Sequence, residues 1–165
     1  MSLSVFNGPV HTHMMHKRHP GWEKEGISFD GHNGVAGNFD LAGASGEELA
    51  WSGIGQHKDQ INPCAFLRFV GAVAGQGTAA QPDVVESVTA GGKETYAAEP
   101  ETTQPMLCAE TAGLLREYMA YNVENKYGSE NFPGLTVCAK SGTGEVGGGQ
   151  KPNAMFAGFL ADSEY

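Results

Sequence analysis

The sequence predicts a domain of the α+β class, in which helices pack on an antiparallel sheet. Residues 61–74 and 107–127 repeat apolar side chains at three- and four-residue steps, a period typical of helices with one buried face. Near the C-terminus, two β-prone apolar runs flank a glycine-rich connection, which predicts a hairpin over residues 135–160. The helices supply one layer of such a domain and the hairpin supplies the other.

The chain has 165 residues, which suits a single domain with a core of its own. Its formal net charge of −9 argues against nucleic acid as a partner, because nucleic-acid binding needs a basic surface. No apolar run reaches membrane-spanning length, and no secretory leader is visible. The three cysteines are too far apart for a zinc or thioredoxin motif, and we expect buried free thiols at Cys64, Cys108 and Cys138.

Four histidines cluster near the start, at His11, His13, His16 and His19. Imidazoles at these spacings can share a metal ion. The segment has no glutamate in an H-E-x-x-H arrangement, however, and the same histidines fit an exposed, partly basic stretch. We therefore predict no resident metal and no cofactor.

Residues 1–48 are expected to be loop-rich, and the opening Met1-Ser-Leu is consistent with a start derived from an expression vector. Glycines recur every few residues from 26 to 46, which favours loop with short extended pieces. Ser45 followed by Glu48 has the spacing of a capping box, so a short helix is expected to begin there.

The clearest helix covers residues 61–74. Asn62 suits its N-cap, Pro63 its first turn and Gly75 its end. We interpret its apolar stripe as core rather than as a binding groove.

The middle of the chain predicts a strand and then a second helix. A short strand is expected over residues 83–88, with a turn at Gly91-Gly92-Lys93 and a polar loop over residues 94–105. The helix over residues 107–127 should end before Gly128 and Pro133.

The first apolar run of the predicted C-terminal hairpin ends with Lys140-Ser-Gly-Thr143. Side chains alternate along a strand, so Lys140 and Gly142 face one way while Ser141 and Thr143 face the other. Gly142 lets a ligand backbone lie close to the strand. An extended peptide that carries a carboxylate can then pair with the strand edge, beside hydroxyls and a cation.

This motif resembles the Lys-Thr/Ser-Gly motif of penicillin-binding proteins and serine β-lactamases. The run Phe132-Pro-Gly-Leu-Thr-Val before it and the run from Asn153 after it resemble the strand, loop and strand of penicillin-binding transpeptidases. Upstream, Gly53-Ile-Gly-Gln and the run from Ile61 resemble the segment before a core helix of that family. The resemblance indicates a partial transpeptidase-like fold, with residues 49–165 as the C-terminal portion of the domain.

The resemblance implies a D,D-transpeptidase, a serine acyltransferase that cross-links peptidoglycan stem peptides and binds β-lactams. Lys140 and Thr143 would then be catalytic, since the lysine shapes the field around the nucleophile and the Thr143 N–H is an oxyanion donor. Ser141, Gly142 and Thr143 would bind the substrate, with the hydroxyls on its carboxylate. The parent of such a domain is expected to be extracytoplasmic and membrane-anchored at the cell envelope.

The chain also departs from the family. The nucleophile motif Ser-x-x-Lys is absent, and the one match to Ser-x-Asn, Ser129-Glu-Asn131, lies in a turn-like stretch just before the Lys140 strand. We therefore expect the chain alone to be inactive toward penicillin. A second interpretation is a non-catalytic structural or ligand-sensing homologue of the same fold.

A nucleotide-binding protein is the third interpretation, because residues 142–147 match G-x-G-x-x-G. It is disfavoured, since a dinucleotide site needs a helix directly after the glycines and the sequence continues with Gly148-Gly-Gln-Lys-Pro. If the strand edge is the substrate track, Lys140 and Ser141 should border solvent, with Val137 and Ala139 packed. We also expect an open apolar face beside the helix at 61–74, or self-association through it.

Overall fold

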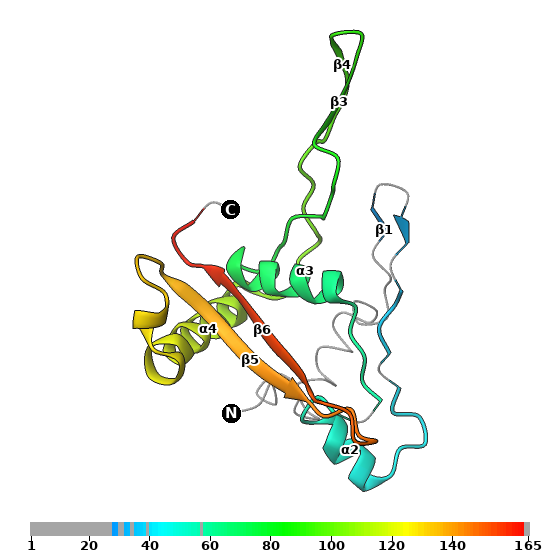
Figure 1. Ribbon diagram of the computed structural model, residues 1–165, viewed down its shortest axis with the longest axis vertical. Helices are drawn as coiled ribbons and strands as arrows, with labels where there is room; N and C mark the ends of the chain where they lie inside the picture. The colour runs from blue at the N-terminus through cyan, green and yellow to red at the C-terminus, as the bar shows by residue number, and fades with distance from the viewer. Residues whose placement is uncertain (1–27, 30–31, 34, 39, 57, 164–165) are drawn as a thin grey trace.

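The computed structural model describes residues 28–29, 32–33, 35–38, 40–56 and 58–163 (Figure 1). Its elements in chain order are β1 (Ser28–Phe29), β2 (His32–Asn33), α2 (Gly46–Ser52), α3 (Pro63–Ala74), β3 (Ser87–Ala90), β4 (Lys93–Ala97), α4 (Ala109–Asn122), the π-helical turn η2 (Val123–Tyr127), the 3-10 turn η3 (Ser129–Asn131), β5 (Val137–Gly144) and β6 (Asn153–Leu160). The strands form three two-stranded antiparallel sheets. The predicted α+β class is confirmed. The histidine cluster lies outside the described residues.

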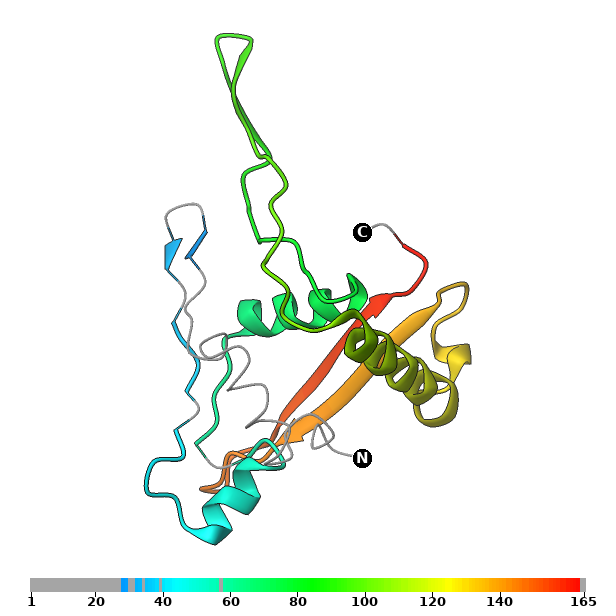
Figure 2. The same ribbon diagram turned by 180° about the vertical axis from the view of Figure 1, so that it is seen from behind.

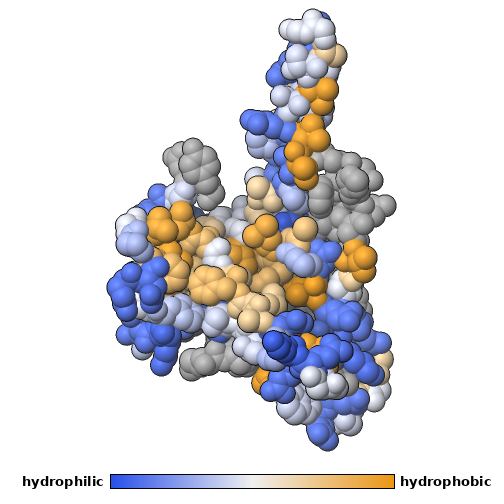
Figure 3. Space-filling view, viewed as in Figure 1, coloured by the Kyte–Doolittle hydropathy of each residue, from blue (hydrophilic) through white to orange (hydrophobic). Residues whose placement is uncertain are grey.

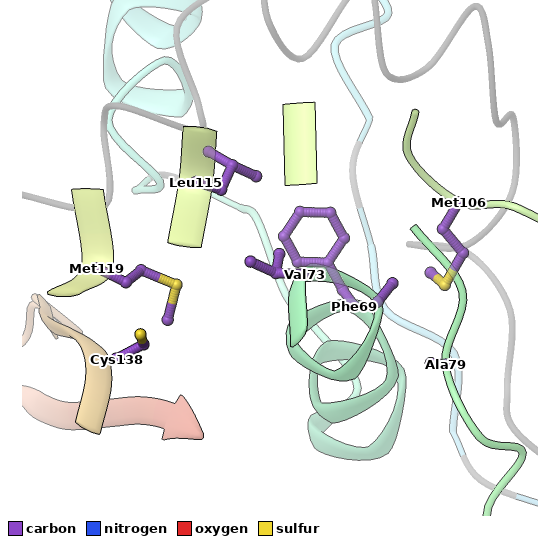
Figure 4. Packing of buried hydrophobic residues seen from close by; sticks show 8 residues of the cluster. Phe69, Val73, Ala79, Met106, Leu115, Met119 and Cys138 are labelled. Carbon is purple, nitrogen blue, oxygen red and sulfur yellow. The ribbon is translucent and has the colours of Figure 1, made fainter. Parts of the chain in front are cut away.

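Helices α3 and α4 lie across one face of the β5–β6 hairpin (Figures 1 and 2). The core forms where these elements meet, and Figure 4 shows side chains from both helices and from β5 converging on it. Its main members are Phe69, Val73, Leu115, Met119 and Cys138, all of which are buried. The apolar stripe of α3 is therefore core, as expected.

Helices α2 and α3 begin where the sequence predicts. The Glu48 N–H donates to Ser45 Oγ at 3.2 Å and the Ser45 N–H donates to Glu48 Oε2 at 2.8 Å, which completes the capping box. Asn62 Oδ1 accepts from the first two free N–H groups of α3, at 2.9 and 3.1 Å. These caps fix the starts of α2 and α3, and residues 53–62 form the connection between the two helices.

Strands β3 and β4 form an arm that projects away from the body (Figure 1). Gly91 and Gly92 turn it with φ values of 60° and 76°, the positive values that a tight hairpin turn requires. The strand expected over residues 83–88 is wrong over 83–86, because β3 begins at Ser87 and ends at Ala90. The expected polar loop is wrong where Lys93–Ala97 forms β4. All residues of both strands are exposed. Because neither strand has a buried face, neither needs the alternating apolar residues by which a strand is recognised in a sequence.

Helix α4 covers most of the second predicted helix, and the turn η2 continues it to Tyr127. Gly128 ends it with a φ of 81°. The expectation of three buried thiols is wrong in part, because Cys138 is buried and Cys64 is half-buried, while Cys108 is exposed as the N-cap of α4. An apolar stretch next to a helix start need not be core.

The face of the hairpin that α3 and α4 leave uncovered is apolar. Figure 3 shows an apolar area over the β5–β6 hairpin, and its exposed members include Leu135, Phe156 and Leu160. Phe156 is 56% exposed, although large aromatic side chains are usually mostly buried. This face lies on the side of the hairpin away from α3, so the expectation of an open apolar face beside the helix at 61–74, or of self-association through it, stays a prediction.

Candidate functional site

Among the described residues, strand β5 pairs with a neighbouring strand along one edge, and its other edge, called the free edge below, pairs with none. It pairs with β6 in register, so that Thr143 lies opposite Ala154. Just before the strand, the Ala161 N–H donates to the Thr136 C=O at 2.7 Å. Bonded and non-bonded pairs alternate along an antiparallel ladder. Even-numbered residues of β5 therefore bond β6, and odd-numbered residues turn their N–H and C=O groups to the free edge.

Side chains of the same molecule cap the first part of this free edge. The Ser141 N–H donates to the Tyr127 hydroxyl at 2.7 Å, and that hydroxyl donates to Ser141 Oγ at 3.0 Å. The Lys140 ammonium donates to the Ser141 C=O, and Asn122 Nδ2 donates to the Ala139 C=O at 3.4 Å. Such capping protects an exposed strand edge from pairing with other chains.

Gln56 caps the last part of the same edge. Its Nε2 donates to the Thr143 C=O at 3.2 Å, and its Oε1 accepts from the Glu145 N–H at 3.2 Å. Between the two capped stretches lies the Thr143 N–H, which by the ladder pattern also points to the free edge. Within the described part of the chain, it donates no hydrogen bond. Between the Ser141 N–H and the Glu145 N–H, which both have side-chain partners, the Thr143 N–H is thus an open donor.

Lys140 is buried, with 8% of its surface exposed, so the prediction that it borders solvent is wrong. It shares a face of β5 with Cys138, the face that α4 covers, and its methylene stem is packed there. Its ammonium turns back to the Ser141 C=O at the strand edge. The other expectations fare better, since Ala139 is fully buried, and Ser141 and Val137 are each half-buried.

The strand brings the predicted site residues together without further help. Ser141 and Gly142 are half-buried and Thr143 is exposed, so all three are accessible at the free edge. Lys140 lies next to them on the face of β5 that α4 covers. Ser141 Oγ is bonded to Tyr127 and not to the Lys140 ammonium, which confirms that these neighbours face opposite ways.

Sequence reasoning missed two residues of this site, Tyr127 and Gln56. Tyr127 packs edge-on against Phe156 with ring centroids 5.6 Å apart, and Phe132 stacks on the same ring at 6.1 Å. No motif marks Tyr127, whose role follows from the way η2 returns it to the strand. Gln56 does carry a signal, because it closes the Gly53-Ile-Gly-Gln run.

Other chemistries find no support in the described residues. The glycine-rich loop after β5 leads into strand β6 and not into a helix, so the dinucleotide interpretation fails. Ser129 is exposed in the 3-10 turn η3, as expected of a turn-like stretch. The described residues contain no group of three or more potential metal ligands, and none of their helices is long and apolar enough to cross a membrane.

Comparisons with known proteins give the family. The family model of the penicillin-binding protein transpeptidase domain matches residues 22–164. No curated protein matched the chain.

Solved structures share the fold. Penicillin-binding protein A from Mycobacterium tuberculosis is similar with a TM-score of 0.70 and 19% identity, over 78% of this chain and 31% of that one. The D,D-transpeptidase domain of a peptidoglycan glycosyltransferase from Eggerthella lenta has a TM-score of 0.72 and 23% identity, over 96% and 41%. Penicillin-binding protein 3 from Mycobacterium tuberculosis, complexed with aztreonam, has a TM-score of 0.65 and 22% identity, over 96% and 38%.

The chain thus spans about 30 to 40% of the length of these structures. Its fold is that of their transpeptidase domains, and the family model covers most of its residues. This chain belongs to the penicillin-binding protein transpeptidase domain family.

Proposed function

We propose that the chain is the ligand-binding C-terminal portion of a D,D-transpeptidase domain, comprising residues 49–165, and that the free edge of β5 holds a peptidoglycan stem peptide or a β-lactam. The open Thr143 N–H carries this proposal. It is the one donor left between edge groups that Tyr127 and Gln56 cap. An extended ligand with a carbonyl or oxyanion has its acceptor there.

The neighbouring groups support a ligand that ends in a carboxylate. Ser141 Oγ accepts a hydrogen bond from Tyr127, so its own proton is available for an anion. The exposed Thr143 hydroxyl lies on the same face of the strand. Gly142 lets the ligand backbone approach, and the Lys140 ammonium adds positive charge from behind the edge.

We infer that the chain does not acylate by itself. Acylation needs a serine with a neighbouring base, and the family builds it from Ser-x-x-Lys, which this sequence lacks. In this proposal Lys140 and Thr143 serve a nucleophile that other residues of a complete domain supply. The parent protein is extracytoplasmic and membrane-anchored at the cell envelope. Intact-mass spectrometry after incubation with benzylpenicillin should show no adduct. A stoichiometric adduct on any serine would contradict this inference.

The edge itself is tested by removing its donor. Thr143→Pro deletes the N–H without breaking the ladder, because that N–H faces away from β6 and proline is tolerated at strand edges. Its matched control, Thr143→Val, removes the hydroxyl and keeps the N–H. For an acetylated peptide that ends in D-Ala-D-Ala, we expect Thr143→Pro to weaken binding about 10- to 100-fold, the range for a hydrogen bond to a charged group, and Thr143→Val to weaken it less. Equal affinity of wild type and Thr143→Pro would overturn the proposal.

A non-catalytic, ligand-sensing homologue is the second candidate, and the absence of Ser-x-x-Lys favours it. The two candidates differ once the chain is joined to a transpeptidase half that carries Ser-x-x-Lys. The first predicts a penicillin adduct that disappears when the serine of that motif is changed to alanine. The second predicts binding without an adduct.

A further inference from the structure

The part of β5 that presents the open donor has little intrinsic order. Thr143 stands between Gly142 and Gly144, and glycine allows its neighbouring peptide planes more rotation than any other residue. After Gly144 the chain leaves the ladder for a glycine-rich loop, so β6 holds this end from one side only. The direction of the Thr143 N–H therefore depends on contacts from elsewhere in the molecule.

Gln56 makes such a contact at the right place. Its carboxamide bonds the C=O of Thr143 and the N–H of Glu145, the two free-edge groups that follow the Thr143 N–H. A neighbouring strand would bond the same pair of groups, one donor and one acceptor, through its own peptide units. Only one orientation of the carboxamide satisfies both bonds, because the nitrogen must donate and the oxygen must accept.

The backbone of Gln56 is itself fixed to helix α2. The Gln56 N–H donates to the Trp51 C=O at 3.1 Å, and the Gly55 N–H donates to the Ser52 C=O at 2.9 Å. Ser52 is almost completely buried, and its hydroxyl donates to Asp59 at 2.8 Å. We call the two hydrogen bonds of the Gln56 side chain, to the Thr143 C=O and the Glu145 N–H, the clamp. Because the Gln56 backbone is fixed to helix α2, the clamp holds the end of β5, 87 residues further along the chain, against that helix.

We propose that Gln56 is a positioning residue, which fixes the peptide planes on either side of Gly144 and thereby aims the Thr143 N–H at the ligand. The inference deepens the proposed function and rests on it for the ligand. Gln56 need not leave when a ligand binds, because the Thr143 carbonyl oxygen can accept a second hydrogen bond.

Two variants separate the halves of the clamp. Gln56→Ala removes both hydrogen bonds. Gln56→Glu keeps an oxygen for the Glu145 N–H but has no donor for the Thr143 C=O, and it places a carboxylate oxygen against that carbonyl. The matched control is Gln60→Ala, which changes an exposed glutamine in the same connection whose backbone pairs with Asn38.

The first readout is amide hydrogen exchange in the ligand-free chain, measured by NMR. We expect exchange at Glu145 to rise at least about fivefold in Gln56→Ala and to stay near wild type in Gln56→Glu and Gln60→Ala, in line with the loss of one hydrogen bond of ordinary strength. Unchanged exchange at Glu145 in Gln56→Ala would overturn the clamp, whatever the chain binds.

The second readout is the affinity for the acetylated D-Ala-D-Ala peptide. We expect both Gln56 variants to bind about tenfold more weakly than wild type, and Gln60→Ala to bind as wild type does, because the donor half of the clamp is lost in both. If both Gln56 variants bind like wild type while Thr143→Pro loses the peptide, the proposed function survives and the positioning role fails. If wild type and Thr143→Pro do not differ, the proposed function fails, and this inference with it.

The amide spectrum of each variant shows whether the variant is folded. If Gln56→Ala does not fold, Gln56→Glu replaces it in the affinity test, because Gln56→Glu keeps one hydrogen bond and the side-chain volume.

Discussion

The two halves of strand β5 differ in what surrounds them. From Val137 to Lys140 the side chains are half-buried or buried, and Cys138 belongs to the core that α3 and α4 build. From Ser141 to Gly144 the strand is accessible, and side chains from distant segments hold its free edge. One strand thus joins a half whose packing stabilises the fold to a half whose polar groups are available to a ligand.

The largest expected effect lies on the buried side. Leu115 packs against the core cluster that includes Cys138, and Leu115→Ala should reduce the free energy of unfolding by about 2–5 kcal/mol. The control is Leu114→Ala on the same helix, where the side chain is exposed and the change should be below about 0.5 kcal/mol. Urea unfolding measures both. Similar losses for the two variants would mean that α4 does not bury the face described.

A smaller effect is expected at the boundary between the halves. Tyr127→Phe keeps the ring contact with Phe156 but leaves the Ser141 N–H without its acceptor. The loss should be about 0.5–1.5 kcal/mol, the usual net contribution of one hydrogen bond, because the Ser141 N–H is only partly buried. Tyr118→Phe, on an exposed side chain, is the control. A Tyr127→Phe chain as stable as wild type would show that the hydroxyl does not hold the strand edge.

These first contrasts also show what the sequence could foresee. The caps of α2 and α3 were predictable because Ser45 and Asn62 act on neighbouring N–H groups a few residues away. The contacts of Tyr127 and Gln56 with β5 were not, because each joins segments that only the tertiary fold brings together. Local chemistry leaves a local signal. The Gly53-Ile-Gly-Gln run marks Gln56 as a residue of interest, but it does not say which distant segment Gln56 contacts.

The burial of Lys140 could not be predicted from the sequence either. Strand alternation correctly placed the side chains of Lys140 and Ser141 on opposite faces of β5, but it could not say which of those faces α4 would cover. The predicted bounds of the strands in the β3–β4 arm were wrong for a different reason. Both strands are exposed and therefore lack the alternation of apolar and polar residues that marks a half-buried strand.

The uncovered face of the hairpin gives a prediction about association. We expect the chain to self-associate through this face, because large contiguous exposed apolar patches usually mark interfaces and Leu135, Phe156 and Leu160 are exposed on it. Phe156→Asp should shift the chain to monomer in sedimentation velocity, and Val88→Asp on the exposed β3–β4 arm should not. A wild-type chain that sediments as a monomer at all concentrations would contradict the prediction.

The smallest expected effects concern the thiols. A hydrogen bond with the Thr111 hydroxyl, at 3.0 Å, lowers the pKa of the exposed Cys108 thiol. Burial raises the pKa of Cys138, and the nearby charge of Arg116 opposes this only in part. Near neutral pH, iodoacetamide should therefore label Cys108 first and Cys138 only on unfolding.

Changing Thr111 to valine tests the cause of that order. Without the hydroxyl the pKa of Cys108 should rise, the thiolate fraction should fall, and labelling should slow, while Cys138 stays unreactive. Peptide mapping by mass spectrometry reads out both sites. Rapid labelling of Cys138 in the folded chain would mean that the buried half of β5 is open to solvent.

The central claim is that the accessible half of β5 holds a ligand through the Thr143 N–H. A titration of the ¹⁵N-labelled chain with an acetylated peptide that ends in D-Ala-D-Ala tests it most directly. The account predicts a saturable shift that is largest at the Thr143 amide, with smaller shifts at Ser141 and Glu145 and none in the core half of the strand. Shifts centred elsewhere, or a Thr143 amide that does not respond at saturation, would contradict it.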